Sequence, residues 1–280
     1  MIKAEDTRTL RQQVQQWRDD HQEIVLVPTL GNLHAGHLAL VERARDLGDR
    51  VVVSIFVNPT QFVQGEDFAD YPRTLDEDLQ QLQTYEVDLI YLPDLQAIYP
   101  DNDVEGVQVA VPALDGRFCG ASRPGHFTGV ATVVTKLLNL VQPHKAVFGE
   151  KDYQQLLVIR KLVKDLHIPV EIIDHPTVRE ADGLAMSSRN RYLTGDERER
   201  APLIYANLCR VRDRILAGER DFRELEQSAR ASLEDAGLRV DYFSVASATD
   251  LSEPAGKQLI ILAAAWLGRA RLIDNLRVSA

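Results

Sequence analysis

The chain has 280 residues, of which 45% are hydrophobic and 26% are charged, an ordinary composition for a globular enzyme. Its 32 Lys and Arg against 42 Asp and Glu give a net charge of −10, which argues against general binding to nucleic acid or anionic membranes. Two cysteines, Cys119 and Cys209, are too few for a disulfide framework. The start of the chain does not resemble a signal peptide, and no run of about eighteen apolar residues is present. We therefore expect a cytoplasmic protein that binds neither nucleic acid nor membrane.

Strand and helix patterns alternate over the first 175 residues. Leu10, Val14 and Trp17, at three- and four-residue spacing, predict an amphipathic first helix over residues 6–20. Apolar runs predict strands at residues 24–27, 50–57, 87–92, 145–148 and 169–174, with helices between them and an extended piece at residues 104–114. This alternation predicts an α/β domain with a doubly wound, Rossmann-like parallel sheet.

The pattern changes after residue 195. Two helical segments, 196–217 and 221–236, are followed by three strand-like runs at 240–246, 258–267 and 270–278. Helices and strands segregated in this way indicate a smaller α+β domain. The boundary should lie near residues 176–190, and we divide the chain into domains 1–180 and 181–280.

A strand-to-helix turn with two histidines is the first candidate site. His34, Gly36 and His37 lie between the strand at 24–27 and a helix that continues through residues 38–45. The first N–H groups of a helix lack intrahelical partners and the helix dipole favours an anion, so a phosphate can bind there. The two histidines share one side of the turn, and Gly36 would let a nucleotide approach the backbone. A helix cap or a solvated histidine pair is the simpler alternative.

Polar residues also stand in other loops. Asn58 and Gln61 follow the strand at 50–57, at the end where open α/β sheets bind ligands, although plain turn chemistry also accounts for them. Lys151 occupies the same kind of position after the strand at 145–148. Arg123, next to a proline and a glycine, could clamp a carboxylate or phosphate or could simply be solvated.

The predicted domain boundary contains Ser187, Ser188 and Arg189. Their hydroxyls can donate to phosphate oxygens, and the arginine can neutralise charge on a departing diphosphate; a serine-rich linker is the alternative. An acidic run, residues 76–78, opens a helix after the expected N-cap Thr74. Compensation of the helix dipole explains this run better than contact with a Mg²⁺–nucleotide.

Two of these motifs together, the histidine turn and Met186–Arg189, resemble the signatures of the nucleotidylyl-transferase superfamily. A closer resemblance is to the pantothenate synthetase (pantoate–β-alanine ligase) family, and it rests on six ordered motifs at residues 28–37, 56–62, 71–74, 123–127, 148–155 and 186–190. The resemblance implies that ATP, carrying Mg²⁺, converts pantoate to pantoyl adenylate, which β-alanine then attacks to give pantothenate and AMP. It also implies a homodimer and a C-terminal domain that acts as a lid.

The resemblance further implies roles for individual residues of this chain. The ATP site would consist of Leu30, Gly31, Asn32, Leu33, His34, Ala35, Gly36, His37, Gly149, Glu150, Lys151, Asp152, Val178, Met186, Ser187, Ser188 and Arg189. The catalytic residues would be His37 (the nominal proton donor), His34, Lys151, Ser187, Ser188 and Arg189. The organic substrates would be held by Gln61, Gln155, Asn58 and Arg123, and no side chain is assigned as a metal ligand.

Two residues depart from the family pattern. Leu30 stands where methionine is usual, with a small expected effect, and Cys119 stands where many members carry glutamate.

Two other functions stay open: a transferase that passes AMP to a phosphate ester and stops there, and a nucleotide-binding module without activity. Transfer-RNA charging is disfavoured by the net charge and by the lack of an anticodon-binding domain.

Overall fold

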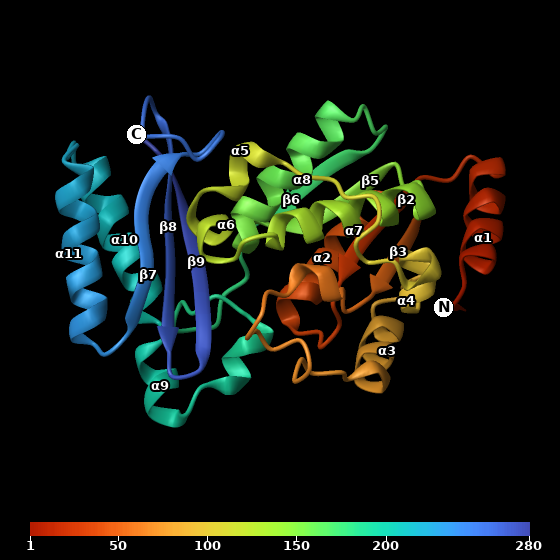
Figure 1. The fold of residues 1–280 in the computed structure, drawn as a ribbon, viewed down its shortest axis with the longest axis horizontal. Coiled ribbons are helices and arrows are strands. Elements are labelled where there is room, and N and C mark those ends of the chain that lie inside the picture. Colours follow the sequence, from red (N-terminus) through yellow and green to blue (C-terminus); the bar gives the residue numbers. More distant parts are fainter.

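The computed structural model describes all 280 residues and contains two β-sheets with helices packed around them (Figure 1). The larger sheet has six parallel strands in the order β1-β4-β3-β2-β5-β6. Their bounds are β1 Ile2–Ala4, β2 Ile24–Thr29, β3 Arg50–Ile55, β4 Leu89–Tyr91, β5 Lys145–Gly149 and β6 Glu171–His175. Apart from the edge strand β1, this is the doubly wound order, in which the winding reverses between β2 and β5. The predicted Rossmann-like sheet is confirmed.

Helices cover both faces of this sheet. Their bounds are α1 Thr7–Asp19, α2 Ala35–Arg45, α3 Leu75–Thr84, α4 Leu95–Ile98, α5 Pro112–Asp115, α6 Phe118–Ser122, α7 His126–Val141 and α8 Tyr153–Asp165, with 3-10 turns η1 Pro59–Gln61, η2 Pro100–Asn102 and η3 Glu150–Asp152. Side chains alternate between the faces along β2, as the pleat of a strand requires. Val25 and Val27 pack with α2, whereas Ile24 and Leu26 join α1, α7 and α8.

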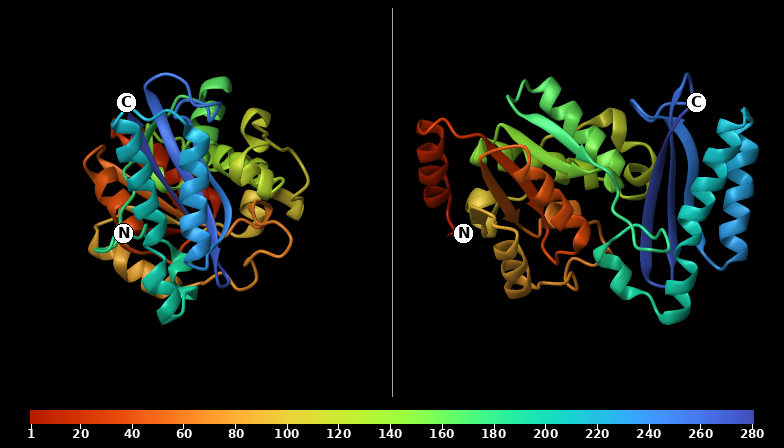
Figure 2. Two further views of the ribbon diagram at one scale, coloured as in Figure 1. Left: turned by 90° about the vertical axis from the view of Figure 1, so that its left-hand side faces the viewer. Right: turned by 180° about the vertical axis from the view of Figure 1, so that it is seen from behind.

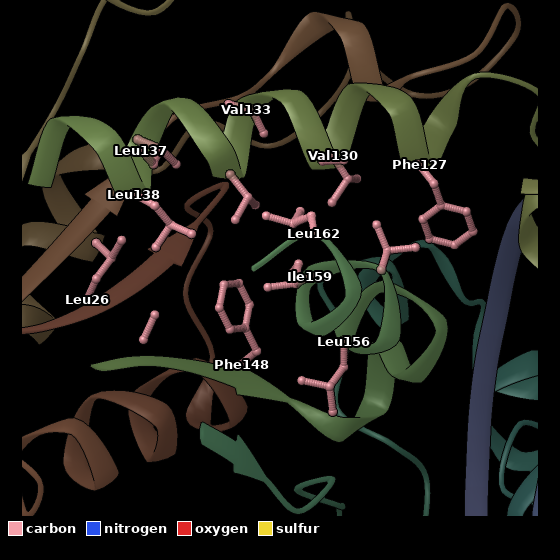
Figure 3. Close-up of a cluster of buried hydrophobic side chains, with 14 of the residues drawn as sticks. Leu26, Phe127, Val130, Val133, Leu137, Leu138, Phe148, Leu156, Ile159 and Leu162 are labelled. Carbon is pink, nitrogen blue, oxygen red and sulfur yellow. The ribbon is translucent and has the colours of Figure 1, made fainter. Parts of the chain in front are cut away.

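The second of these apolar layers is the largest core cluster of the molecule. Figure 3 shows side chains of α7 facing those of α8 and β5, among them Val130, Leu138, Ile159, Leu162 and Phe148. All five are at most 5% exposed. The layer fixes α7 and α8 against the sheet and so determines where the loops at its carboxyl edge lie.

The C-terminal part contains η4 Ser188–Tyr192, α9 Gly195–Arg200, α10 Leu203–Leu216 and α11 Phe222–Asp235, followed by the antiparallel strands β7 Arg239–Ser247, β8 Gln258–Leu267 and β9 Ala270–Ser279. Helices α10 and α11 lie over the outer face of this small sheet (Figure 2). On its inner face, Ala246, Ile260 and Leu262 belong to the same buried cluster as α7 and α8. None of the helices has both the length and the apolar character needed to span a bilayer.

Three details of the prediction differ from the structure. Strand β1 is absent from the prediction, because three residues are too few for a periodic pattern. The extended piece expected at residues 104–114 consists of turns and irregular backbone over 104–111 and then the start of α5, and Val109 N–H donates to the Thr132 hydroxyl rather than to a sheet edge. The helix expected over 196–217 is broken between α9 and α10, where Pro202 lacks an N–H to donate.

A close approach of α7 to η1 generates a testable prediction. A Cβ added at Gly129 of α7 would lie 2.2 Å from the carbonyl oxygen of Thr60, so the helix and the turn cannot both keep their places. We expect Gly129→Ala to lower the free energy of unfolding by roughly 1–3 kcal/mol, measured by urea denaturation. Gly116→Ala is the matched control, because nothing lies within 4 Å of its added Cβ. Equal stabilities of the two variants would contradict the prediction.

Candidate active site

A cavity of about 240 Å³ opens at the carboxyl ends of β2 and β5, where the winding of the sheet reverses. Most of the predicted site residues line it: Leu30, His34, Gly36, His37, Gln61, Arg123, Gly149, Lys151, Asp152, Gln155, Val178, Met186, Ser187, Ser188 and Arg189. The others do not line the cavity: Gly31, Asn32, Leu33, Ala35, Glu150 and Asn58. Loops from both parts of the chain thus contribute to one cavity.

The two histidines of the first turn also cap helix α2. His34 is the N-cap residue, and its Nδ1 accepts a hydrogen bond from Gly36 N–H at 3.1 Å. His37 Nδ1 accepts from His34 N–H at 3.4 Å, and the two ring centroids are 4.1 Å apart. Because each Nδ1 is an acceptor, each neutral ring carries its proton on Nε2. The capping role therefore leaves one N–H donor on each histidine for a ligand.

Gly36 also has a role in the packing of the turn itself. A Cβ there would lie 2.9 Å from ring atoms of His34, so Gly36 makes room for the folded-back imidazole. Gly36 also lines the cavity, so close approach of a nucleotide to its backbone stays a prediction.

Desolvation keeps both histidines uncharged. The pKa of His34 is lowered to about 4, mainly because the ring is removed from water and secondly because of the positive charge of Lys151. The pKa of His37 is lowered to about 3, mainly because the ring is removed from water and secondly because His34 lies beside it. Both rings are therefore neutral at pH 7 and act as hydrogen-bond donors through Nε2–H rather than as cations.

A buried carboxylate that the sequence analysis did not single out holds this turn in place. Asp78 of α3 is 1% exposed and accepts the N–H groups of Asn32 and Leu33, both at 2.8 Å. Its position in the acidic run suggests only compensation of the helix dipole. Its four-residue spacing from the buried Leu82 places it on the inner face of α3, which is the signal that could have identified it. Thr74 occupies the N-cap position but makes no capping hydrogen bond with its side chain.

Asn58 lies behind Gln61 rather than in the cavity. It is 1% exposed, and its Nδ2 donates to Gln61 Oε1 and to the carbonyl oxygen of Gly129, both at 3.2 Å. The hydroxyl of Tyr99 donates to Asn58 Oδ1 at 2.7 Å. Since Gln61 Oε1 is used as an acceptor within the protein, the Nε2 protons of Gln61 remain as its free donors.

Both arginines of the cavity are paired with consecutive acidic residues of one loop. Arg123 binds Glu66 through two hydrogen bonds of 2.5 and 2.7 Å, and Arg189 binds Asp67 at 2.7 Å. The Lys151 ammonium is farther from its nearest carboxylate, 3.9 Å from Asp152. The structure therefore presents Lys151 as the cation least engaged by protein partners, and both arginines as cations with internal counterions.

Several residues that line the cavity were not predicted as site residues. His126 links two that were: its Nε2 accepts from Arg123 at 2.8 Å, and its Nδ1 donates to the carbonyl oxygen of Gln61 at 2.6 Å. Burial, followed by the charge of Arg123, lowers its pKa to about 4. One wall is apolar and consists of Phe56, Phe62, Val130, Val133, Val134 and Leu137. His126, Phe56 and Phe62 carried a signal, since they lie in motifs behind the family resemblance.

Comparison with known proteins assigns the chain to a family. Residues 3–277 match the family model described as pantoate–β-alanine ligase. The chain is 55% identical to the pantothenate synthetase of Methylococcus capsulatus over 265 residues, which are 94% of this chain and 93% of that protein. It belongs to the pantoate–β-alanine ligase family. The pantothenate synthetase of Chromohalobacter salexigens is a further relative, 52% identical over 100% of this chain and 99% of its own length.

Solved structures of the ligase family share the whole fold. The pantothenate synthetase of Thermus thermophilus superposes with a TM-score of 0.92 at 43% identity, with both chains fully covered. The pantoate–β-alanine ligase of Francisella tularensis, solved as a complex with β-γ ATP and β-alanine, has a TM-score of 0.81 at 35% identity, with 99% and 97% covered. The family resemblance and the fold class expected from the sequence are both confirmed.

The Asp78 clamp, meaning the two hydrogen bonds that the Asp78 carboxylate accepts from Asn32 and Leu33, can be tested directly. Asp78→Ala leaves two buried N–H groups without acceptors, and each such group costs roughly 1–3 kcal/mol. We expect a corresponding drop in the free energy of unfolding and weaker binding of ATP, measured by urea denaturation and by calorimetric titration. Asp76→Ala, an exposed position on the same helix, is the control and should change stability by no more than about 0.5 kcal/mol. A variant as stable as this control would show that the clamp is dispensable.

The three histidines that line the cavity predict a loss of stability in mild acid. His34, His37 and His126 have lowered pKa values in the folded protein, so the unfolded chain binds more protons as the pH falls below about 6.5. We expect the free energy of unfolding to decrease by about 2 kcal/mol or more between pH 7 and pH 5. Urea denaturation at several pH values measures it, and NMR should show the three rings neutral above about pH 5. Stability that stayed constant or rose over this range would contradict the assignment.

Proposed function

We propose that this cavity forms pantothenate, AMP and diphosphate from pantoate, β-alanine and ATP, through an enzyme-bound pantoyl adenylate. The observation that carries the proposal is the meeting of two sets of residues in one cavity. The histidine turn and Ser187–Arg189 supply donors and cations suited to a polyphosphate, while Gln61 and Gln155 supply neutral amides suited to a hydroxy acid. Membership of the ligase family supports this assignment independently.

In the first step a carboxylate oxygen of pantoate bonds to the α-phosphorus of ATP, and the bond from that phosphorus to the diphosphate oxygen breaks. The substrate carboxylate is itself the nucleophile, so no covalent enzyme intermediate is needed. The neutral Nε2–H donors of His34 and His37 and the charge of Lys151 would stabilise the negative charge that develops on the phosphate oxygens. The cavity also holds two anions together that would otherwise repel each other.

The pantoate end of the cavity would combine neutral donors with an apolar wall. Gln61, oriented by Asn58, would present its amide protons without adding a charge. The valines of α7 that line the cavity, Val130, Val133 and Val134, suit the two methyl groups of pantoate. Arg123 would contribute mainly through His126 and Gln61, because Glu66 occupies its guanidinium.

In the second step the amine of β-alanine attacks the acyl carbon of the adenylate, a C–N bond forms, and the bond from that carbon to the phosphate oxygen breaks to release AMP. Water would hydrolyse the adenylate if it entered first, so exclusion of water is part of the chemistry. We assign this task to the part of the chain over residues 181–280, acting as a lid on residues 1–180. The proposal includes a homodimer and a cytoplasmic location.

Mg²⁺ would arrive with ATP and screen the charge of its phosphate oxygens. Asp152 is the acidic side chain that lines the cavity, and about half of its side-chain surface is open, 48% exposed. A single accessible carboxylate fits the usual way in which proteins hold Mg²⁺, with most ligands coming from phosphate and water.

An omission assay tests the proposal. Pantothenate and AMP should form together only when ATP, pantoate and β-alanine are all present, and AMP release that does not depend on β-alanine would support an AMP-transferring enzyme instead.

His37→Ala should lower kcat by about 10²–10³, the usual effect of losing one charge-stabilising donor. His21→Ala, at an exposed histidine outside the cavity, should retain full turnover. Normal turnover in His37→Ala would remove His37 from the mechanism.

A further inference from the structure

Two consecutive residues of β9, Asp274 and Asn275, connect the small sheet to both sets of loops that line the cavity. Each residue is only 5% exposed, and neither lines the cavity itself. The Asn275 side chain bonds to the turn that carries Lys151. The Asp274 side chain bonds to Arg179, in the segment that leads to Ser187–Arg189.

Asn275 holds the Lys151 turn by its backbone. Its Nδ2 donates to the carbonyl oxygens of Glu150 and Lys151, both at 2.9 Å, so both amide protons are used. These carbonyls belong to η3, which lies between β5 and α8. The backbone from which the Lys151 side chain extends is therefore fixed by a strand 124 residues away in the sequence.

Asp274 holds the other side through Arg179. The two carboxylate oxygens of Asp274 accept from the Arg179 guanidinium at 2.6 and 2.9 Å. The same guanidinium donates to the carbonyl oxygen of Gly183 at 3.0 Å and lies 3.7 Å from the ring centroid of Tyr205. A planar guanidinium held on two edges and one face has a single position available.

The Arg179 segment leads directly into the predicted phosphate-binding residues. Arg179 and Ala185 form an isolated antiparallel bridge, and Met186 N–H donates to the carbonyl oxygen of Val178 at 3.0 Å. Val178 and Met186 both line the cavity. A shift of Arg179 would therefore be transmitted to the start of the Ser187–Arg189 segment.

We propose that Asp274 and Asn275 are positioning residues that set the separation of the Lys151 turn and the Met186–Arg189 segment across the ATP site. The inference rests on the proposed function, because it assigns ATP to these two segments. Apolar contacts of Ala246, Ile260 and Leu262 already hold the small sheet against the large one. Asp274 and Asn275 are therefore not needed to hold the two sheets together, and their hydrogen bonds can instead set the positions of the two segments.

Asn275→Asp tests the proposal with a minimal change of shape. An aspartate would turn an acceptor toward two carbonyl oxygens and displace the Lys151 turn. We expect the rate of ATP–diphosphate exchange with pantoate to fall by about tenfold or more per active site, since small displacements of charge-stabilising groups are costly. The rate at which β-alanine consumes preformed enzyme-bound adenylate should change by less than about threefold. A purely structural defect would lower both rates by the same factor.

Arg277→Gln is the matched control. Arg277 lies on the same strand and bonds to the same turn, but through the Glu150 carboxylate at 2.8 Å and with 47% of its own side chain exposed. Because the arginine of this pair is nearly half exposed, its loss should change the exchange rate by less than about twofold. Asn275→Ala is measured alongside, because it removes the donors without adding a charge and should show a smaller loss in the same direction. Circular dichroism and thermal unfolding verify that each variant is folded.

Binding of a non-hydrolysable ATP analogue, measured by calorimetry, separates this inference from the proposed function because it requires no turnover. We expect Kd to rise by about tenfold in Asn275→Asp and to stay unchanged in Arg277→Gln. Equal exchange rates and equal Kd values for Asn275→Asp and the wild type would overturn the positioning role while the ligase activity stood. A wild type that binds the analogue but makes no pantothenate would overturn the proposed function, and the Kd comparison would still decide the role of Asn275.

Discussion

The geometry of the site depends on one buried carboxylate. Asp78 tolerates the desolvation of burial because two backbone N–H groups of the Asn32–Leu33 turn point at it. This constraint also dictates the neighbouring residue: Gly31 adopts a φ of +81°, and a Cβ there would lie 3.1 Å from the Asp78 carboxylate. The histidines that follow can face the cavity because the chain before them is held on a neighbouring helix.

The histidine turn shows that a structural and a functional role can share one side chain. Nδ1 of His34 caps the helix, and the same bond forces the proton onto Nε2, where a ligand can use it. The alternatives of cap and phosphate donor, which the sequence leaves open, are therefore compatible. Desolvation completes the arrangement by keeping the ring neutral, so that its tautomer is determined by a hydrogen bond.

Features that depend on local patterns could be predicted from the sequence, and features that depend on distant partners could not. Apolar runs identified five of the six parallel strands, and the loops at the ends of those strands pointed to His34, Lys151 and Gln61, which line the cavity. Asp78 was misinterpreted because its partners lie 46 and 45 residues earlier, and Asn275 went unnoticed because its partners lie 125 and 124 residues earlier. Ion pairs between distant residues could not be predicted either. Nothing in the sequence spacing indicates that Glu66 would pair with Arg123 and Asp67 with Arg189.

The packing of the inner face of the small sheet determines how the two parts of the chain unfold. Ala246, Ile260 and Leu262 lie within the same apolar cluster that packs α7 on α8, so the two sheets share one interior despite their separate topologies. Apolar surface shared in this way couples the unfolding of its two sides, since exposing either one hydrates both. The two parts should therefore melt in a single transition, and a chain nicked between them should stay together as a noncovalent complex.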